Sequence, residues 1–124
     1  MIHLDTSFLI RALLSGSRQQ RRLLAWLDGP EPVAVSAVAW AEFLCGPVSA
    51  ELTDLARTLL GDPVALGAAQ AEAAAGLFNT AGRRRGSLLD CLVAATALQA
   101  GATLATENVR DFERFKAAGL TLVA

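Results

Sequence analysis

The feature that most constrains the fold is a regular alternation of short apolar segments with longer segments of helical periodicity. The short segments predict buried strands at Met1–Leu4, Val33–Val35, Thr103–Thr106 and Leu120–Val123, with a further candidate at Val64–Leu66. Between them, hydrophobic residues recur every three or four positions, the spacing of an amphipathic helix. Because strands that alternate with helices favour a parallel sheet covered on both faces, we predict a three-layer α/β/α sandwich with a short-stranded, mainly parallel sheet.

Capping residues and glycines set the expected ends of the helices. Ser17, Ser36 and Ser87 each stand where a serine can cap the first turn of a helix. Gly29-Pro30 and Gly46-Pro47 end two of these segments. The predicted helices follow Asp5 or Thr6 and run from Ser17 to Leu27, Ser36 to Cys45, Ala50 to Leu60, Gln70 to Ala81, Ser87 to Ala100, and Glu107 or Asn108 to Phe115.

Length and composition indicate one domain over residues 1–124 that needs no disulfide or structural metal. The chain is 53% hydrophobic, and a domain of this size buries roughly two-thirds of its unfolded surface. Cys45 and Cys91 lie in apolar helical segments, so we expect two reduced, buried thiols. His3 is the only histidine, which excludes multi-histidine metal sites. We expect a cytoplasmic protein, because no segment resembles a membrane span or a secretory leader.

Three acidic residues stand in apolar surroundings, where ionised side chains are rare. Asp5 ends the first predicted strand, and Glu42 lies within the apolar segment Val38–Leu44. Asp90 falls in the first turn of a helix, and no Lys or Arg stands beside any of the three in the sequence. Buried carboxylates without cationic partners are best explained by a bound cation.

Parallel sheets bind ligands at the carboxyl ends of their strands, where Asp5 lies and where the helix that carries Asp90 can begin. Three carboxylates in one crevice repel one another, and Mg²⁺ removes that conflict because it takes oxygen ligands. Such a metal site serves phosphodiester cleavage. Structural roles stay open on the sequence: Asp5 as a helix cap, Asp90 as a complement to the helix dipole, and Glu42 as a solvated side chain.

Four motifs occur in order along the chain. An apolar strand runs into Asp-Thr-Ser at Met1–Ser7, Val35-Ser36 precedes Ala41-Glu42, Asp-x-Leu-Val-Ala-Ala-x-Ala occupies Asp90–Ala97, and Leu-x-Thr-x-Asn-x-x-Asp-Phe occupies Leu104–Phe112. This arrangement resembles the PIN-domain family, specifically the VapC-like toxins of bacterial toxin–antitoxin pairs. The resemblance covers essentially the whole chain.

The resemblance implies an endoribonuclease that depends on Mg²⁺ or Mn²⁺, forms a homodimer and is inhibited by a cognate VapB-type antitoxin in a hetero-oligomer. It implies metal-binding or catalytic roles for Asp5, Glu42 and Asp90. It also places Thr6 and Thr106 at hydroxyl positions that orient carboxylates or water.

The chain departs from the family pattern at one position. Many PIN domains carry a fourth aspartate where this chain has Asn108, whose amide has no charge. A second metal ion is therefore expected to bind weakly without RNA. Asp111, one helical turn further on, is the other candidate ligand, through water, and a role as an ordinary first-turn acid is equally open.

Arg83–Arg85 form the one dense basic run in a chain of net charge −1. They could contact RNA phosphates, or form a solvated helix end, which is the commoner role of such a run.

Two other functions share parts of this pattern. A receiver-type signalling domain also has an acidic Mg²⁺ pocket, but it needs paired acids after the first strand, and here Thr6-Ser7 follow Asp5. A non-catalytic PIN-like module that binds RNA or protein would not need three intact acids. Ribonuclease assays with and without Mg²⁺ separate these alternatives.

Overall fold

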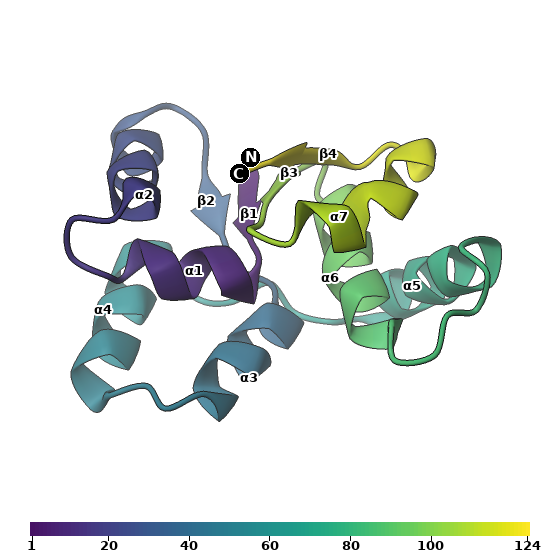
Figure 1. Ribbon diagram of the computed structural model, residues 1–124, viewed down its shortest axis with the longest axis horizontal. Helices are drawn as coiled ribbons and strands as arrows, with labels where there is room; N and C mark the ends of the chain where they lie inside the picture. The colour runs from purple at the N-terminus through teal and green to yellow at the C-terminus, as the bar shows by residue number, and fades with distance from the viewer.

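The computed structural model describes all residues, 1–124, and places a four-stranded sheet between groups of helices (Figure 1). The strands are β1 (Ile2–Leu4), β2 (Val33–Ala34), β3 (Thr103–Ala105) and β4 (Thr121–Val123). Their order across the sheet is β2-β1-β3-β4, and every neighbouring pair is parallel. The prediction of an α/β fold with a short-stranded parallel sheet is confirmed.

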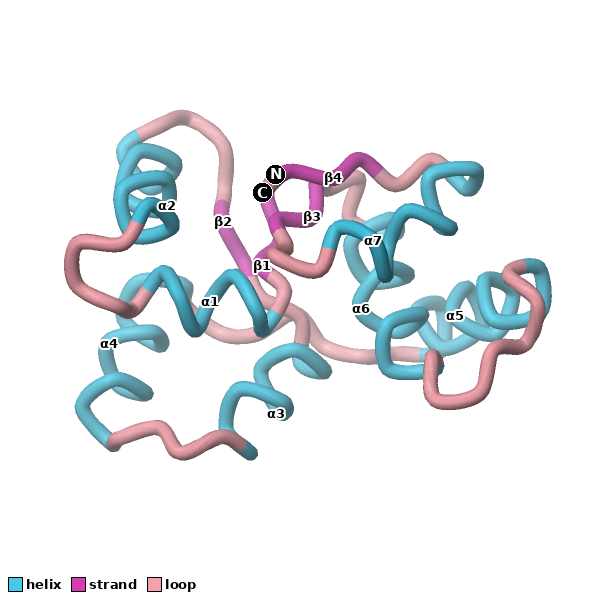
Figure 2. The backbone as a smooth tube through the Cα atoms, viewed as in Figure 1, coloured by secondary structure: helices cyan, strands magenta, loops and turns pink.

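The helices divide into two groups on either side of the strands. Figure 1 shows α1 to α4 in one half of the molecule and α5 to α7 in the other, with the two chain ends close together beside the sheet. Figure 2 shows how short the strands are beside the helical layers. The helices are α1 (Thr6–Ala12), α2 (Arg18–Asp28), α3 (Ala37–Cys45), α4 (Ala50–Leu60), α5 (Ala68–Thr80), α6 (Leu88–Gln99), α7 (Val109–Phe112) and the 3-10 helix η1 (Glu113–Ala118). None of them is long and apolar enough to cross a membrane.

Two of the three predicted serine caps are present. The Ser17 Oγ accepts from the Gln20 backbone N–H at 2.9 Å, and the Ser36 Oγ accepts from that of Ala39 at 3.1 Å. The cap expected from Ser87 is wrong, because its hydroxyl donates to the Arg84 carbonyl oxygen at 2.6 Å and makes no side-chain cap. The start of α6 is thereby tied to the loop that precedes it.

Two further expectations are corrected by the structure. Val64–Leu66 is not a strand: Val64 alone bridges to Ser36. Pro63 has no N–H with which to extend that pairing towards the N-terminus, and Leu66 is exposed. Cys91 is buried as expected, whereas Cys45 is exposed because it is the last residue of α3.

The core lies around the two central strands. All three residues of β1 are buried, and the largest enclosed side chains include Phe8, Phe112 and Phe115. Each such side chain contributes about 1.5–3 kcal/mol when removed from water. His3 is buried among them, and burial lowers its pKa and keeps the imidazole neutral. The packing holds the carboxyl ends of β1 and β3 in fixed positions.

Candidate active site

The site lies at the carboxyl ends of β1 and β3, which are adjacent in the sheet. From β1 the chain passes to β2 on one side, and it later returns to form β3 on the other side. This is the switch point at which open α/β sheets bind ligands. Asp5 directly follows β1 and Thr106 directly follows β3, so the topology alone brings these two residues together.

The Asp5 carboxylate is buried and does not serve as a helix cap. Asp5 stands at the N-cap position of α1, yet its side chain makes no capping bond. Its Oδ2 accepts from the Ser7 Oγ and from the Thr106 Oγ1, each at 2.8 Å, and no hydrogen bond reaches Oδ1. Only 6% of the residue is exposed. The helix-cap role left open by the sequence is therefore excluded, and one carboxylate oxygen is left without a protein donor.

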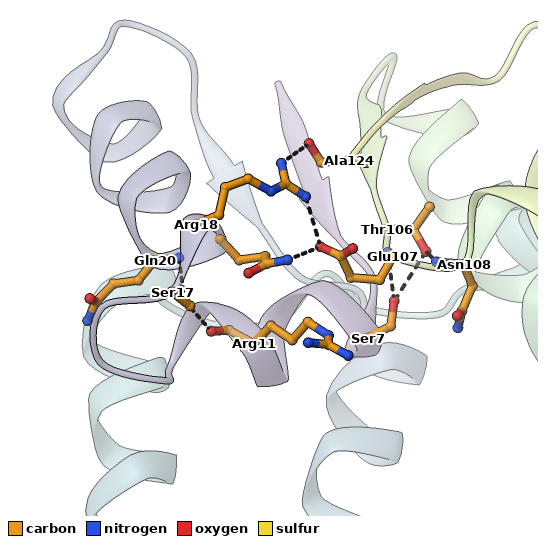
Figure 3. Close-up of polar contacts among 10 residues, drawn as sticks. Ser7, Arg11, Ser17, Arg18, Gln20, Thr106, Glu107, Asn108 and Ala124 are labelled. Atoms are coloured by element: carbon orange, nitrogen blue, oxygen red, sulfur yellow. Dashed lines mark hydrogen bonds and ion pairs between the residues drawn. The ribbon is translucent and has the colours of Figure 1, made fainter.

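Both hydroxyl groups that donate to Asp5 also accept hydrogen bonds from the backbone. The Ser7 Oγ accepts from the Glu107 N–H at 3.0 Å, and the Thr106 Oγ1 accepts from the Asn108 N–H at 2.9 Å (Figure 3). The two hydroxyl oxygens also lie 3.2 Å apart, and both donate to the same oxygen of Asp5. The loop between β3 and α7 is thus fastened to the first strand end, and the Asp5 carboxylate is held in one orientation.

The side chain of Glu107 makes its contacts with α2 and not with Asp5. Its side chain accepts from the Gln19 Nε2 and lies 3.6 Å from the Arg18 Nη2 (Figure 3). Arg18 also donates to the carbonyl oxygen of Ala124 at 3.1 Å. These contacts connect α2 to the β3–α7 loop and to the C-terminus, so Glu107 has a structural role.

Glu42, half-buried on α3, is electrostatically coupled to both other predicted acids. Burial raises the pKa of the Glu42 carboxyl, and the charges of Asp5 and Asp90 raise it further. The nearby Thr6 hydroxyl, which donates to the Ala39 carbonyl oxygen at 3.0 Å, opposes this rise. Thr6 therefore both ties α1 to α3 and lies beside Glu42.

Asp90, on the first turn of α6, has a cationic partner that the sequence did not suggest. Burial raises the pKa of the Asp90 carboxyl, and Asp5 and Asp111 add to this effect. Arg114 and Arg84 act in the opposite direction, and the Arg114 Nη2 lies 3.7 Å from the Asp90 Oδ2. Arg114 is 24 positions along the chain from Asp90, and only the packing of η1 near α6 brings the two together.

The donor chemistry fits a divalent cation, but no complete protein cage exists. No three His, Cys, Asp or Glu side chains lie close enough together to hold a metal ion as a set. Mg²⁺ typically binds through one or two carboxylates and keeps water or substrate phosphate as its other ligands. Asp5, with its free Oδ1, and Asp90 are the two carboxylates that would serve such an ion, and Glu42 is electrostatically coupled to both.

The two weaker ligand candidates differ in their surroundings. Asn108 is exposed, and its side chain makes no hydrogen bond. Asp111 is partly buried and close enough to Asp90 to raise the pKa of that carboxyl. Asp111 is therefore coupled to the acidic group, while Asn108 contributes its backbone N–H to Thr106.

Sequence analysis missed two residues of the site. Ser7 stands in the Asp-Thr-Ser motif, and its position two residues after Asp5 was the available signal. Arg114 carried no sequence signal, because its contact with Asp90 depends on tertiary packing.

Comparisons with known proteins identify the family of this fold. The family model of the PIN domain matches residues 2–118. The chain is similar in structure to VapBC2 from Rickettsia felis bound to a promoter DNA fragment (22% identity over 99% of this chain and 98% of that chain, TM-score 0.78). It is also similar to a toxin–antitoxin complex from Klebsiella pneumoniae (27% identity over 100% of this chain and 97% of that chain, TM-score 0.73). A third similar structure is the sarcin–ricin-loop-cleaving toxin VapC20 from Mycobacterium tuberculosis (20% identity over 98% of this chain and 97% of that chain, TM-score 0.67). No curated protein matches the chain.

Proposed function

This chain belongs to the PIN-domain family, and from that premise we propose that it is a metal-dependent endoribonuclease, the toxic component of a toxin–antitoxin pair. The observation that carries the proposal is the environment of the Asp5 carboxylate. Its carboxylate is buried at the switch point of the sheet and held by two hydroxyls. It has no cationic side chain as a partner, and it is coupled to Glu42 and Asp90. A buried carboxylate with one oxygen left unpaired is costly to a fold, and a bound cation would offset that cost.

In this mechanism Asp5 and Asp90 would hold Mg²⁺ or Mn²⁺, with Glu42 acting directly or through water. The metal ion, when bound, supplies Lewis-acid stabilisation of the charge on the scissile phosphate. Ser7 and Thr106 keep the Asp5 carboxylate in one orientation. Glu42, whose pKa is raised above its ordinary value, is suited to accept the proton of an attacking water molecule.

The experiment that tests the activity measures RNA cleavage by the purified chain with Mg²⁺, with Mn²⁺ and with EDTA. We expect cleavage with either metal and none with the chelator. Full activity in EDTA would contradict the metal mechanism. Absence of cleavage under all three conditions would favour a non-catalytic module that binds RNA or protein.

The proposed partners are a VapB-type antitoxin and a second copy of the chain. An antitoxin segment should cover the acidic crevice and place an Arg or Lys among the carboxylates, because a cation there compensates the same charge as the metal. Exposed leucines at Leu44, Leu88 and Leu89 provide apolar helical surface for a homodimer. Purification from the native operon tests the first proposal by co-elution of the antitoxin. Consistent isolation of the chain alone would oppose it.

A further inference from the structure

A polar cavity that includes Asp90 lies beside the other acidic residues and carries more cationic than anionic side chains. Its volume is about 230 Å³, and no apolar side chain lines it. Two stretches that are distant in the sequence contribute to it: the α5–α6 loop with the first turn of α6, and α7 with η1. These segments all lie in the same half of the molecule in Figure 1. The lining residues are Arg84, Arg85, Gly86, Ser87, Asp90, Asp111 and Arg114.

The charges of this cavity do not cancel. Three guanidinium groups face two carboxylates, which leaves an excess of one positive charge in a chain whose net charge is −1. The carboxylate of Asp90 belongs both to this cavity and to the acidic site. A cationic pocket is therefore continuous with the proposed catalytic carboxylates.

Arg114 is fixed in place and only partly neutralised. The Cζ of its guanidinium lies 4.5 Å from the centroid of the Phe115 ring, and its Nη2 lies 3.7 Å from the Asp90 Oδ2. That separation exceeds a hydrogen bond, and the buried Nε and Nη2 have no protein acceptor. The Arg114 side chain is 19% exposed, so its positive charge reaches the cavity while its Nε and Nη2 stay buried.

The loop before α6 directs two arginines to the cavity and leaves a third outside it. Arg83 adopts a left-handed backbone conformation with φ of 53°, and Gly82 and Gly86 on either side of the arginine run have φ of 89° and 78°. The Arg84 carbonyl oxygen is bound by the Ser87 hydroxyl at 2.6 Å. Arg84 and Arg85 therefore line the cavity, whereas Arg83 does not.

We propose that this cavity binds a backbone phosphate of a single-stranded RNA, adjacent to the phosphate that enters the acidic site. The proposal rests on the proposed function, since the bound strand is the substrate of that site. Arginine forks match phosphate oxygens in geometry and charge. With no aromatic or apolar side chain in its lining, the cavity offers no surface on which a base could stack, so it contacts the backbone and not the bases.

Binding of a short fluorescent oligouridine to the full chain in EDTA tests this proposal without depending on metal or on cleavage. Arg84→Ala and Arg85→Ala should each weaken binding by about tenfold and reduce the slope of log affinity against log salt by about 0.7. Arg83→Ala is the matched control and should leave both quantities unchanged. Arg114→Lys keeps the charge but removes the fork, and it should weaken binding with its melting temperature preserved.

Two results would overturn the proposal: equal losses in the Arg83→Ala and Arg84→Ala proteins, or no loss in any cavity variant. Its failure can be told apart from failure of the proposed function. A chain that cleaves RNA with Mg²⁺ while Arg84→Ala and Arg85→Ala bind normally retains its nuclease assignment and loses the phosphate cavity. A chain that never cleaves RNA, but whose binding depends on Arg84 and Arg85 and not on Arg83, retains the cavity and loses the nuclease assignment.

Discussion

The strand-end carboxylate, Asp5, and the helix carboxylates, Glu42 and Asp90, are held in different ways. Asp5 is almost fully buried and oriented by two hydroxyl donors at 2.8 Å. Glu42 and Asp90 are half-exposed and accept no hydrogen bond of comparable geometry. Their protonation is governed by burial and by charges on other segments.

This difference indicates that the three carboxylates of the site have different roles. A carboxylate fixed by short hydrogen bonds is suited to hold a ligand in a constant position, because little reorganisation is needed on binding. Carboxylates whose pKa is raised by burial and by neighbouring charges are suited to respond when a cation or a proton arrives. Substitutions of the carboxylates, and of the hydroxyls that hold Asp5, should therefore differ in the size of their effects.

The largest expected effect is the loss of ribonuclease activity when either of the proposed metal-binding carboxylates is neutralised. Asp5→Asn and Asp90→Asn should each lower cleavage by about 100-fold or more, because each removes a negative oxygen ligand and the charge that binds the cation. Circular dichroism should show a retained fold. Asp54→Asn, at an exposed position of α4, is the control and should cleave RNA normally. Full activity of the Asp90→Asn protein would show that Asp90 is not needed and that only the strand-end carboxylate, Asp5, belongs to the metal site.

The second effect concerns the hydroxyls that orient Asp5. Thr106→Val removes the donor to the Asp5 Oδ2 and should lower kcat/KM and Mn²⁺ affinity by roughly 10–100-fold. Thr106→Ser should restore most of both, because it returns the hydroxyl. Thr96→Val is the matched control, since the Thr96 hydroxyl donates within α6 to the Leu92 carbonyl oxygen at 2.8 Å. Equal activity of the Thr106→Val and Thr106→Ser proteins would show that the orientation of Asp5 is unimportant.

A third and smaller effect is expected for the second metal ion. Calorimetric titration of Mn²⁺ into the free chain should show one well-held ion and one weak site, because Asn108 adds no charge. Asn108→Asp should strengthen the weak site by up to about tenfold, while Asp111→Asn tests the other candidate ligand. Two tight sites in the unmodified chain would indicate that Asp111 already compensates for Asn108.

The smallest expected effect is a change in melting temperature when Glu42 is substituted. The pKa of Glu42 in the folded chain lies above its ordinary value of 4.5, so the ionised form opposes folding once the pH rises above that value. Glu42→Gln should therefore raise the melting temperature at pH 7, by an amount that solvent screening of this partly exposed group keeps small.

The gain should disappear below about pH 4.5, where Glu42 is protonated in both the folded and the unfolded chain. Glu72→Gln, at an exposed position of α5, should change the melting temperature little at either pH. A lower melting temperature for Glu42→Gln at pH 7 would mean that the Glu42 carboxylate stabilises the fold and is not strained by its acidic neighbours.

Much of the fold could be predicted from the sequence, because its signals are local. The apolar run before Asp5 and the serines before α2 and α3 act on residues within a few positions, so periodicity and capping chemistry identified those elements. The prediction failed at Val64–Leu66 and at Ser87, where a neighbouring proline and the Arg84 carbonyl oxygen decided the local structure.

The sequence by itself determined the alternation of strands and helices and the isolation of Asp5, Glu42 and Asp90 among apolar residues. Only the tertiary structure decided how their charges are balanced. The hydrogen bond from Thr106 to Asp5 joins residues 101 positions apart, and Arg114 reaches Asp90 from a separate segment. Such contacts arise because parallel pairing brings the ends of distant strands to one edge of the sheet, and no short-range pattern records which side chains meet there.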